Sequence, residues 1–334
     1  MSVTKTSEIF AGSDSADLQL ATDGQLRHLL TLRGLSRELI TSLLDQSVKF
    51  LSPPGSPVIR SEALQGRTIA NLFFEPSTRT RASFQLAATR LGADVLNLDV
   101  NTSSRAKGES ILDTIYTLQA MQIDIFVVRD ASTGIPAYIA SHANEFISIL
   151  NAGESTVAHP TQGLLDLLTI RQHKGSFENL AVAIVGDIAH SRVARSAAEG
   201  LMTMGVGELR LVSPRGLALD SDVVPGARLL HDLDDGIRDA DVVMALRIQR
   251  ERIDDIDGIP GMDEYAANFG VSHARMKLAA PDAIIMHPGP INRGVEIESS
   301  LADSPASVIA EQVTNGVAVR MAILSTVARA LATK

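Results

Sequence analysis

The sequence of 334 residues contains no cysteine, and it has no apolar run long enough to span a bilayer. The lack of cysteine excludes disulfide bonds, thiolate metal ligands and a cysteine nucleophile. The first two dozen residues lack the apolar core of a signal peptide and are rich in Ser, Thr, Asp and Gly. We therefore expect a cytoplasmic protein in which residues 1–24 form a mobile arm.

Positive charge is also scarce. The chain carries 30 Lys and Arg against 39 Asp and Glu, which gives a formal net charge of −9. An acidic protein of this kind is not expected to bind nucleic acid or an anionic membrane. Any site for an anion must therefore be a local cluster of Arg and Lys.

Strand and helix patterns alternate from Leu35 to the C-terminus. Buried-strand patterns occur at 67–74, 94–99, 123–129, 146–152, 180–187, 208–214, 241–246 and 282–290. This alternation predicts an α/β fold with two doubly wound parallel-sheet domains joined by a helix over 161–175. The amphipathic segment 311–332 is long enough to return to the first domain as a C-terminal helix. We expect the first domain to comprise 25–160 plus 308–334, and the second 161–307.

The segment FFEPSTRTRASF, residues 73–84, places a cationic and hydroxyl-rich cluster directly after the first strand pattern. A helix that begins near Thr78 would direct its free N–H groups and the positive end of its dipole toward this loop. Ser77, Thr78 and Thr80 add hydroxyl donors, and Arg79 offers a two-pronged contact to phosphate. A simple helix cap needs one hydroxyl and no arginine, so the cluster favours a phosphate site.

Other polar groups follow later strand patterns of the first domain, where ligands of parallel sheets bind. Arg129 ends the third pattern, and His159 and Gln162 come after the fourth. The loop 101–113, which carries Lys107, reads by itself as an inert surface loop.

In the second domain, Gly186 is the single glycine of a loop that lacks the G-x-G-x-x-G pattern, which excludes a nicotinamide cofactor. Arg192 begins the next helix, where a carboxylate ligand could lie. Arg247 and Gln249 follow a later strand, and HPGP at 287–290 predicts a turn. The sequence has no paired-carboxylate site, metal-ligand spacing or G-x-S-x-G motif. The cationic groups suit a reaction in which a phosphate leaves and an oxyanion develops.

Together these segments resemble the aspartate/ornithine carbamoyltransferase family, and within it the aspartate carbamoyltransferase catalytic chains. FFEPSTRTRASF, KGES, HPTQ, GD…SR, LRIQRER and HPGPINRG stand in the family's order. The resemblance runs from about Leu35 to the C-terminus and leaves only the N-terminal arm outside it.

The resemblance implies a role for each matching residue. The catalytic residues implied are Arg79, Thr80, Lys107, Arg129 and His159. Carbamoyl phosphate would be bound by Ser77, Thr78, Arg79, Thr80, Ser103, Lys107, Arg129, His159 and Gln162. Aspartate would be bound by Lys107, Arg192, Arg247 and Gln249, and backbone groups of Pro288 and Gly289 would orient the amine and the carbamoyl NH2. The family uses neither a metal nor another cofactor.

The resemblance also implies a homotrimer, because the loop with Ser103 and Lys107 reaches a neighbouring subunit's site in this family. The reaction would be attack of the α-amine of L-aspartate on carbamoyl phosphate, the committed step of pyrimidine biosynthesis. A higher assembly with a dihydroorotase or a related chain, and allosteric regulation by nucleotides, stay open. Two interpretations of the N-terminal arm stay open: a disordered tail without function, or a segment that serves one of these two purposes.

Three alternatives stay open. Ornithine carbamoyltransferases share the phosphate loop, but their second-substrate segments carry a Ser-Met-Gly sequence and a cysteine. This chain instead has Leu246-Arg247-Ile248-Gln249 and no cysteine, and Arg247 would repel a cationic side chain. The others are a carbamoyltransferase for another amino acid and an inactive scaffold paralogue, although none of the six motifs is damaged.

Overall fold

The structure is a computed structural model that describes residues 15–332 except 54, 99–109, 221–222 and 250–259. In the order of the chain, the first half contains α1 (Arg37–Val48), β1 (Thr68–Phe73), α2 (Thr78–Arg90), β2 (Asp94–Leu98), α3 (Ile111–Ala120), β3 (Ile125–Asp130), α4 (Ile135–His142), β4 (Ser148–Glu154) and α5 (Pro160–Lys174). The second half contains β5 (Ala181–Val185), α6 (Arg192–Thr203), β6 (Glu208–Val212), the 3-10 helix η3 (Arg215–Leu217), β7 (Arg228–Leu230), α7 (Leu233–Ile237), β8 (Val242–Ala245), α8 (Met262–Phe269), α9 (His273–Met276), β9 (Ile284–Met286), α10 (Ser299–Ala302) and α11 (Ile309–Ala332).

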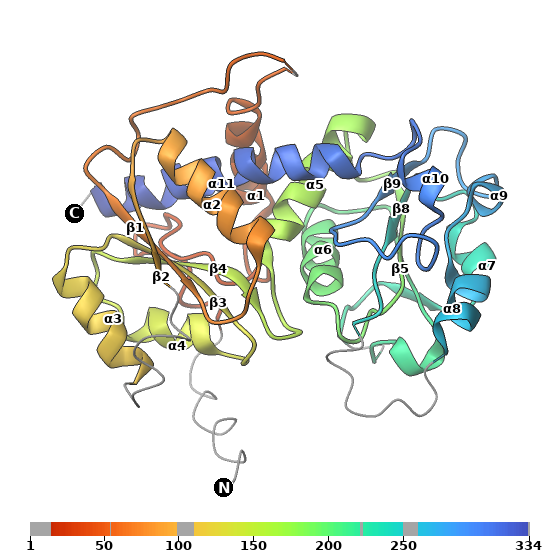
Figure 1. The fold of residues 1–334 in the computed structure, drawn as a ribbon, viewed down its shortest axis with the longest axis horizontal. Helices are drawn as coiled ribbons and strands as arrows, with labels where there is room; N and C mark the ends of the chain where they lie inside the picture. Colours follow the sequence, from red (N-terminus) through yellow and green to blue (C-terminus); the bar gives the residue numbers. More distant parts are fainter. Residues whose placement is uncertain (1–14, 54, 99–109, 221–222, 250–259, 333–334) are drawn as a thin grey trace, which may run out of the picture. The chain divides into compact units, whose positions relative to one another are not determined.

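The first sheet is parallel and has the strand order β2-β1-β3-β4 (Figure 1). The chain moves from β1 outward to β2 and then back across the sheet to β3 and β4. Right-handed crossovers therefore place α2 on one face of the sheet and α3 and α4 on the other. The core between this second face and its helices is built from apolar side chains of β1, β3, β4, α3 and α4. Both faces are covered, which explains why β1 and β3 are almost entirely buried.

The second sheet is also parallel and has the order β7-β6-β5-β8-β9. The chain runs outward from β5 to β7 and then crosses back to β8 and β9, so that α6 lies on one face and α7, α8 and α9 on the other (Figure 1). Side chains of α7 and α8 pack with those of β5 and β8 in one core. The predicted α/β fold with two doubly wound parallel sheets is confirmed.

The chain divides into two compact units, residues 1–164 with 315–334 and residues 165–314. Both boundaries fall inside helices. The first lies within α5, and the second lies within α11, whose C-terminal part belongs to the first unit. Among the described residues, no helix is both long enough and apolar enough to span a membrane.

Residues 15–24 belong to the first unit and are fixed to it, so the mobile arm predicted for 1–24 does not extend over them. Gln19 is fully buried, and its Oε1 accepts hydrogen bonds from the N–H groups of Leu30 and Thr31 at 2.9 and 3.0 Å. Leu29 forms a parallel bridge with Leu150 of β4. Gln19 thus holds the nearby segment 28–30, which covers the edge of the sheet where β4 would otherwise expose unpaired backbone groups. The polar composition of the segment hid this role, because the burial of one glutamine is decided by distant backbone groups.

His28 lies in the segment 28–30 that covers β4, and it makes the stability of the fold sensitive to acid. Burial lowers the pKa of His28 from 6.5 to about 3, with a smaller contribution from Arg27, and the Nδ1 atom accepts a hydrogen bond from Ile149 N–H at 2.9 Å. The folded state holds the neutral ring, so below pH 6.5 the unfolded chain binds a proton that the folded chain does not. Stability should therefore fall as the pH drops from 6.5 toward 3, by at most about 1.4 kcal/mol per pH unit from this group.

We expect His28→Asn to flatten this dependence, because the amide oxygen can accept from Ile149 but does not titrate in this range. The check is urea unfolding of wild type and variant between pH 7 and 4. His142→Asn, at an exposed position, is the control. An equal pH slope in wild type and His28→Asn would contradict the assignment.

Candidate active site

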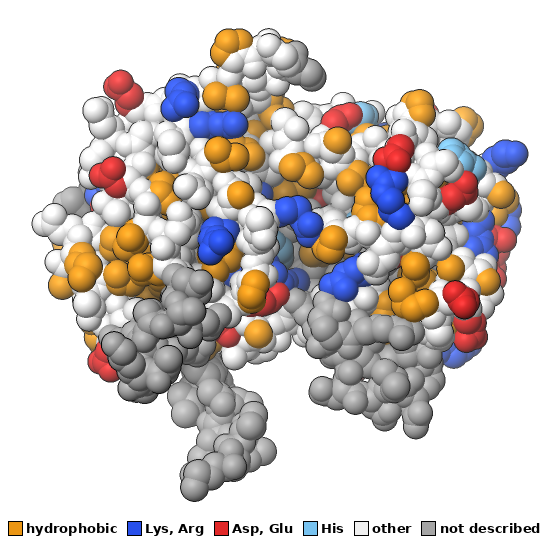
Figure 2. Space-filling model, in the orientation of Figure 1, with side chains coloured by type: hydrophobic (Ala, Val, Ile, Leu, Met, Phe, Trp, Pro, Cys, Tyr) orange, Lys and Arg blue, Asp and Glu red, His pale blue; other side chains and the backbone are white. Residues whose placement is uncertain are grey.

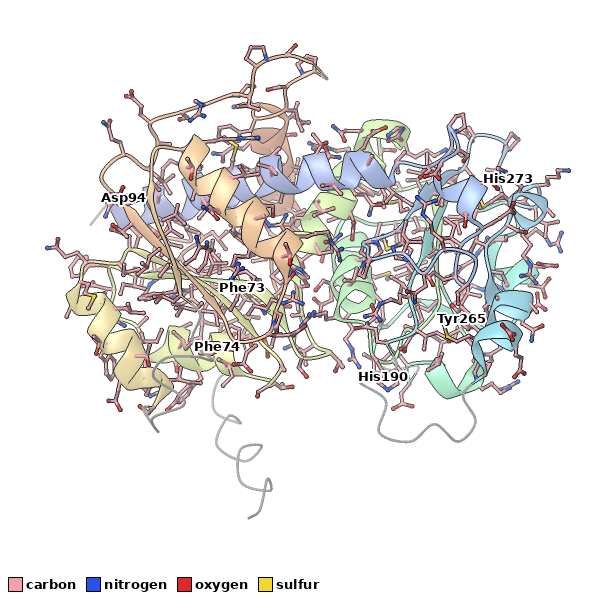
Figure 3. The ribbon with its side chains drawn as sticks, in the orientation of Figure 1. Phe73, Phe74, Asp94, His190, Tyr265 and His273 are labelled. Atoms are coloured by element: carbon pink, nitrogen blue, oxygen red, sulfur yellow. The ribbon has the colours of Figure 1, made fainter. Side chains whose placement is uncertain are left out.

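The predicted phosphate-binding residues follow β1, β3 and β4, which are neighbours in the first sheet. Because the strands are parallel, their carboxyl ends meet at the same edge. Phe73 pairs in register with Arg129, and Phe74 and Glu75 N–H both donate to the Arg129 carbonyl. Phe73 ends β1, and Phe74 directly follows it (Figure 3). The loop after β1 is thus anchored directly to the end of β3.

Helix α2 begins at Thr78, as the sequence predicts, and its first turn is left uncapped. Ser77 occupies the N-cap position, but its side chain accepts no hydrogen bond from the helix. Its hydroxyl donates instead to Thr80 Oγ1 at 3.0 Å, and Thr80 is buried. Arg79 is exposed, and it makes no hydrogen bond or ion pair with the other residues that the structure describes. An uncapped helix start beside an exposed arginine can bind a phosphate.

Arg129 is buried and held by two contacts. Its Nη2 donates to Glu75 Oε1 at 2.7 Å, and its Nη1 donates to the Ala152 carbonyl at 3.0 Å. The guanidinium therefore links the ends of three strand segments in a fixed orientation. Glu75 lies in the same loop segment but was not among the residues predicted for the site.

His159 and Gln162 are also buried, at the start of α5. The carbonyl of His159 accepts hydrogen bonds from the N–H groups of Gln162 and Gly163. Behind this turn, buried Arg320 of α11 donates to Thr161 Oγ1 at 3.3 Å and lies over the ring of Phe84 of α2, 5.0 Å from its centroid. Arg320 thus links the start of α5 to the middle of α2.

In the second unit, Asp187 organises the loops after β5 and β8. Its Oδ1 accepts from His190 N at 3.1 Å and contacts His190 Nδ1 at 2.8 Å, while its Oδ2 accepts from Gln249 N at 3.0 Å. Gln249 Nε2 donates to the His190 carbonyl at 3.1 Å. Gly186 is needed just before this carboxylate, because its φ is +135° and a Cβ there would lie 2.5 Å from the Leu246 carbonyl oxygen. His190, in the loop after β5, is labelled in Figure 3.

The two arginines predicted for a carboxylate ligand lie on these same two loops. Arg192 is the first residue of α6 and is buried, and Arg247 follows β8 and is half-buried. Ser191 caps α6 by accepting from Ala194 N–H at 3.1 Å. Because β5 and β8 are neighbours, the structure brings both arginines to one edge of the second sheet.

Pro288 and Gly289 form a turn just after β9, which is the next strand beyond β8. Within the part of the chain that the structure describes, no hydrogen bond ends on the carbonyl of either residue. Two unoccupied carbonyls at a strand end can accept hydrogen bonds from an amine or an amide NH2. Ser103 and Lys107, which were predicted for this site, lie outside the described residues.

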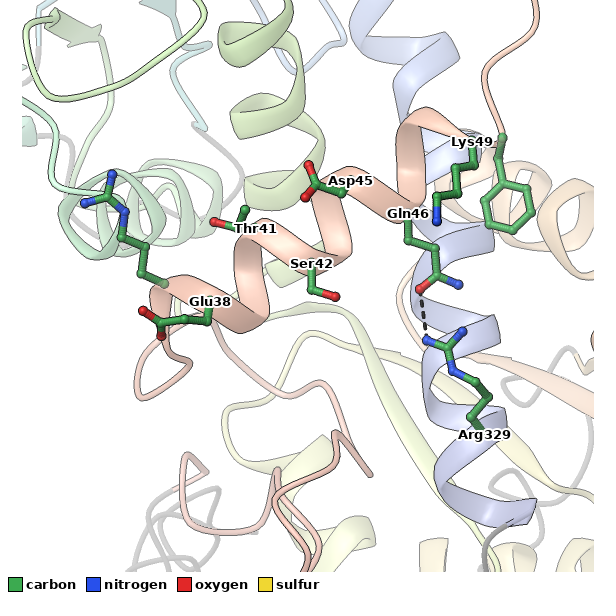
Figure 4. Close-up of a pocket in the computed structure, with 9 residues that line it drawn as sticks. Glu38, Thr41, Ser42, Asp45, Gln46, Lys49 and Arg329 are labelled. Atoms are coloured by element: carbon green, nitrogen blue, oxygen red, sulfur yellow. Dashed lines mark hydrogen bonds between the residues drawn. The ribbon is translucent and has the colours of Figure 1, made fainter.

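A cavity in the first unit contains none of the predicted site residues. It has a volume of about 780 Å³ and lies beside α1 and α11 (Figure 4). It is lined by Arg37, Glu38, Thr41, Ser42, Asp45, Gln46, Lys49, Phe50 and Arg329. This lining mixes basic and acidic side chains, unlike the cationic groups predicted at the strand ends. Basic and acidic side chains are likewise both present on the face shown in Figure 2.

Two family models match the chain. The carbamoyl-phosphate-binding domain of aspartate/ornithine carbamoyltransferases matches residues 27–172, and the aspartate/ornithine-binding domain matches residues 178–327. The chain belongs to the aspartate/ornithine carbamoyltransferase family. The resemblance seen in the sequence is confirmed, and the protein is a carbamoyltransferase by family.

Solved structures of both branches of the family are similar to this carbamoyltransferase. Aspartate transcarbamoylase from Trypanosoma cruzi, in complex with N-(phosphonacetyl)-L-aspartic acid, is 30% identical with a TM-score of 0.80, and the match covers 94% of this chain and 99% of that chain. Ornithine carbamoyltransferase from Pyrococcus furiosus is 29% identical with a TM-score of 0.79, covering 90% and 96%. The enzyme from Thermus thermophilus is 26% identical with a TM-score of 0.78, covering 90% and 98%. Overall similarity therefore does not distinguish aspartate from ornithine as the second substrate.

Proposed function

We propose that this carbamoyltransferase uses L-aspartate and forms N-carbamoyl-L-aspartate and phosphate, a step of pyrimidine biosynthesis. The observation that carries the proposal is the pair of arginines, Arg192 and Arg247, at the ends of neighbouring strands. Two fixed cations suit the two carboxylates of aspartate, whereas Arg247 would repel the ammonium group of ornithine. Aspartate transcarbamoylase from Trypanosoma cruzi has been solved with carbamoyl phosphate and aspartate bound, which supports this choice.

In the proposed reaction, the neutral α-amine forms a C–N bond to the carbamoyl carbon and gives a tetrahedral intermediate, and the C–O bond to phosphate breaks when this intermediate collapses. The tetrahedral intermediate carries an oxyanion that Thr80, Arg129 and His159 would stabilise. The fixed orientation of Arg129 costs no reorganisation as this charge develops. The phosphate would leave against Arg79 and the uncapped start of α2, and it can accept the proton that the amine loses.

The carbonyls of Pro288 and Gly289 would accept hydrogen bonds from the attacking amine and the carbamoyl NH2, and so align them. We also propose that Ser103 and Lys107 complete the site from a neighbouring subunit of a homotrimer. Cytoplasmic location stays a prediction from the composition and the N-terminal sequence, and a larger assembly with a dihydroorotase-like chain and nucleotide regulation stay predictions from the resemblance.

Binding of N-(phosphonacetyl)-L-aspartic acid tests the proposal without turnover. This compound joins a phosphonate, the kind of group proposed for the α2 start, to aspartate, whose two carboxylates are proposed for the arginines. We expect calorimetry to show binding at least about 100-fold tighter than that of the corresponding phosphonacetyl-ornithine, because only the former presents a second carboxylate. Equal affinities, or tighter binding of the ornithine compound, would contradict aspartate as the substrate.

A further inference from the structure

His287 directly follows β9 and is almost completely inaccessible, with 1% of its side chain exposed. Both ring nitrogens contact groups of the chain. Nδ1 accepts a hydrogen bond from Gly289 N–H at 2.8 Å, and Nε2 lies 3.1 Å from Glu296 Oε1. The Gly289 bond requires Nδ1 to be without a proton, so the ring proton sits on Nε2 and is donated to Glu296.

Glu296 is also buried, with 1% of its side chain exposed, and its Oε1 accepts a second hydrogen bond, from Asn292 N–H at 2.6 Å. A buried carboxylate is costly unless donors surround it. Through two contacts, Glu296 holds the segment 287–292 at both ends: it contacts the His287 imidazole at one end and the Asn292 N–H at the other.

The backbone of His287 is fixed from behind. Its N–H donates to Gln312 Oε1 of α11 at 2.9 Å, and Gln312 Nε2 donates to Asp166 Oδ1 of α5 at 2.8 Å. All three residues are buried. The backbone of His287 is thus fixed, so that its imidazole can hold the turn in place.

The hydrogen bond to His287 determines what the turn can offer a ligand. Pro288 and Pro290 have no N–H, and the N–H of Gly289 is used by the imidazole. The turn is therefore left with carbonyl acceptors alone, and it matches a ligand that presents N–H donors. A turn with a free Gly289 N–H would present a donor to an incoming amine and could rotate.

We infer that His287 and Glu296 are positioning residues that hold the 288–290 turn with its carbonyls toward the amine of the second substrate. The inference rests on the proposed function, since it gives the turn a role in carbamoyl transfer to an amine. The hydrogen bond on which it depends can nevertheless be tested without substrate. His287 would act on the reaction only through the turn.

Two substitutions of His287 separate its two contacts. In His287→Asn, the amide oxygen can take the place of Nδ1 and accept from Gly289 N–H. In His287→Gln, the longer amide can reach the place of Nε2 and donate to Glu296, but Gly289 N–H loses its acceptor. The control is Tyr265→Phe, because the Tyr265 hydroxyl is buried near Glu296 and has no hydrogen-bond partner in the described part of the unit (Figure 3).

Hydrogen–deuterium exchange of peptides that begin at residue 286 or 287 reports on Gly289, since its prolyl neighbours contribute no amide. We expect exchange of the ligand-free enzyme to rise at least about tenfold in His287→Gln, and to stay within about threefold of wild type in His287→Asn and Tyr265→Phe. Equal exchange in both His287 variants would overturn the assigned hydrogen bond, whatever the substrate is.

Steady-state kinetics then tests the consequence. We expect kcat/KM for the amino acid to fall about 100-fold in His287→Gln and at most about fivefold in His287→Asn, with the KM for carbamoyl phosphate nearly unchanged in both. A general packing defect would lower the melting temperature and affect both substrates alike. Equal losses in the two His287 variants, or an equal loss in Tyr265→Phe, would overturn the inference.

The proposed function fails separately, through the wild-type enzyme. If wild type carbamoylates an amine other than aspartate, the same contrast between the His287 variants is measured with that amine and decides the inference. If folded wild type carbamoylates no amine, both the function and the positioning role are contradicted.

Discussion

Replacing Arg79 with alanine should lower kcat by about 10³-fold while leaving the fold intact. The side chain is exposed at the start of α2 and makes no hydrogen bond with the rest of the described chain, so its removal leaves no buried group unpaired. Its proposed partner is the departing phosphate, whose charge grows in the transition state. Rapid assay of phosphate release, with the melting temperature measured in parallel, provides the check.

Two matched variants show whether the effect belongs to this guanidinium. Arg79→Lys keeps the charge but loses the planar fork, and we expect a loss between about 10-fold and 100-fold. Arg81→Ala removes an exposed charge from the same cluster, two residues further along α2, and should change kcat by less than about threefold. Similar losses in Arg79→Ala and Arg81→Ala would mean that the cluster acts only as a diffuse field, and the assignment of Arg79 to the phosphate would be wrong.

Replacing Arg247 with alanine should lower kcat/KM for L-aspartate by about 10³-fold, because a half-buried charge-assisted contact to a carboxylate is lost. The effect should lie mainly in the KM for aspartate. The KM for carbamoyl phosphate should change by less than about threefold, since its proposed ligands stand on the strand ends of the other sheet. Initial rates with each substrate varied in turn give both values.

Arg215→Ala is the control for Arg247, because it removes an exposed arginine from the same sheet edge, after β6. We expect it to alter kcat/KM by less than about twofold. In Arg247→Ala the preference for aspartate over ornithine should shrink toward unity, since the group that distinguishes the two side chains is gone. A variant that kept full aspartate activity would show that another group binds the second carboxylate.

The phosphate loop could be predicted from the local sequence. An apolar strand that stops at Phe74, followed by hydroxyls and arginines at a helix start, specifies its own geometry within a few residues, and α2 begins at Thr78 as predicted. The same holds for Arg192 at the start of α6 and for the turn at Pro288. In each case the signal lies within one strand, one turn and one helix.

The supporting contacts could not be predicted in this way. Asp187 holds Gln249 across 62 positions of the chain, and Asp166 reaches Gln312 across 146 positions. Such pairs form only after the sheet has assembled, and the spacing of apolar residues in the sequence does not predict them. The short elements β7 and α10 were also missed, because patterns of three or four residues rarely distinguish a strand or a helix from a loop.

For Gln19, the composition of the surrounding segment predicted mobility where the structure has a buried side chain. Its surroundings are polar and rich in small residues, which predicted a mobile arm, yet its amide satisfies two backbone N–H groups at the edge of the first sheet. A single side chain that pairs with otherwise unsatisfied buried donors outweighs the composition of the segment around it.

The central claim is that aspartate is the second substrate, and direct competition tests it. Wild-type enzyme is supplied with carbamoyl phosphate and equal concentrations of L-aspartate and L-ornithine, and the ratio of the two carbamoylated products gives the ratio of their kcat/KM values. We predict that N-carbamoyl-L-aspartate exceeds citrulline by at least about 10³-fold. A product mixture dominated by citrulline, or one with comparable amounts of both products, would contradict the claim.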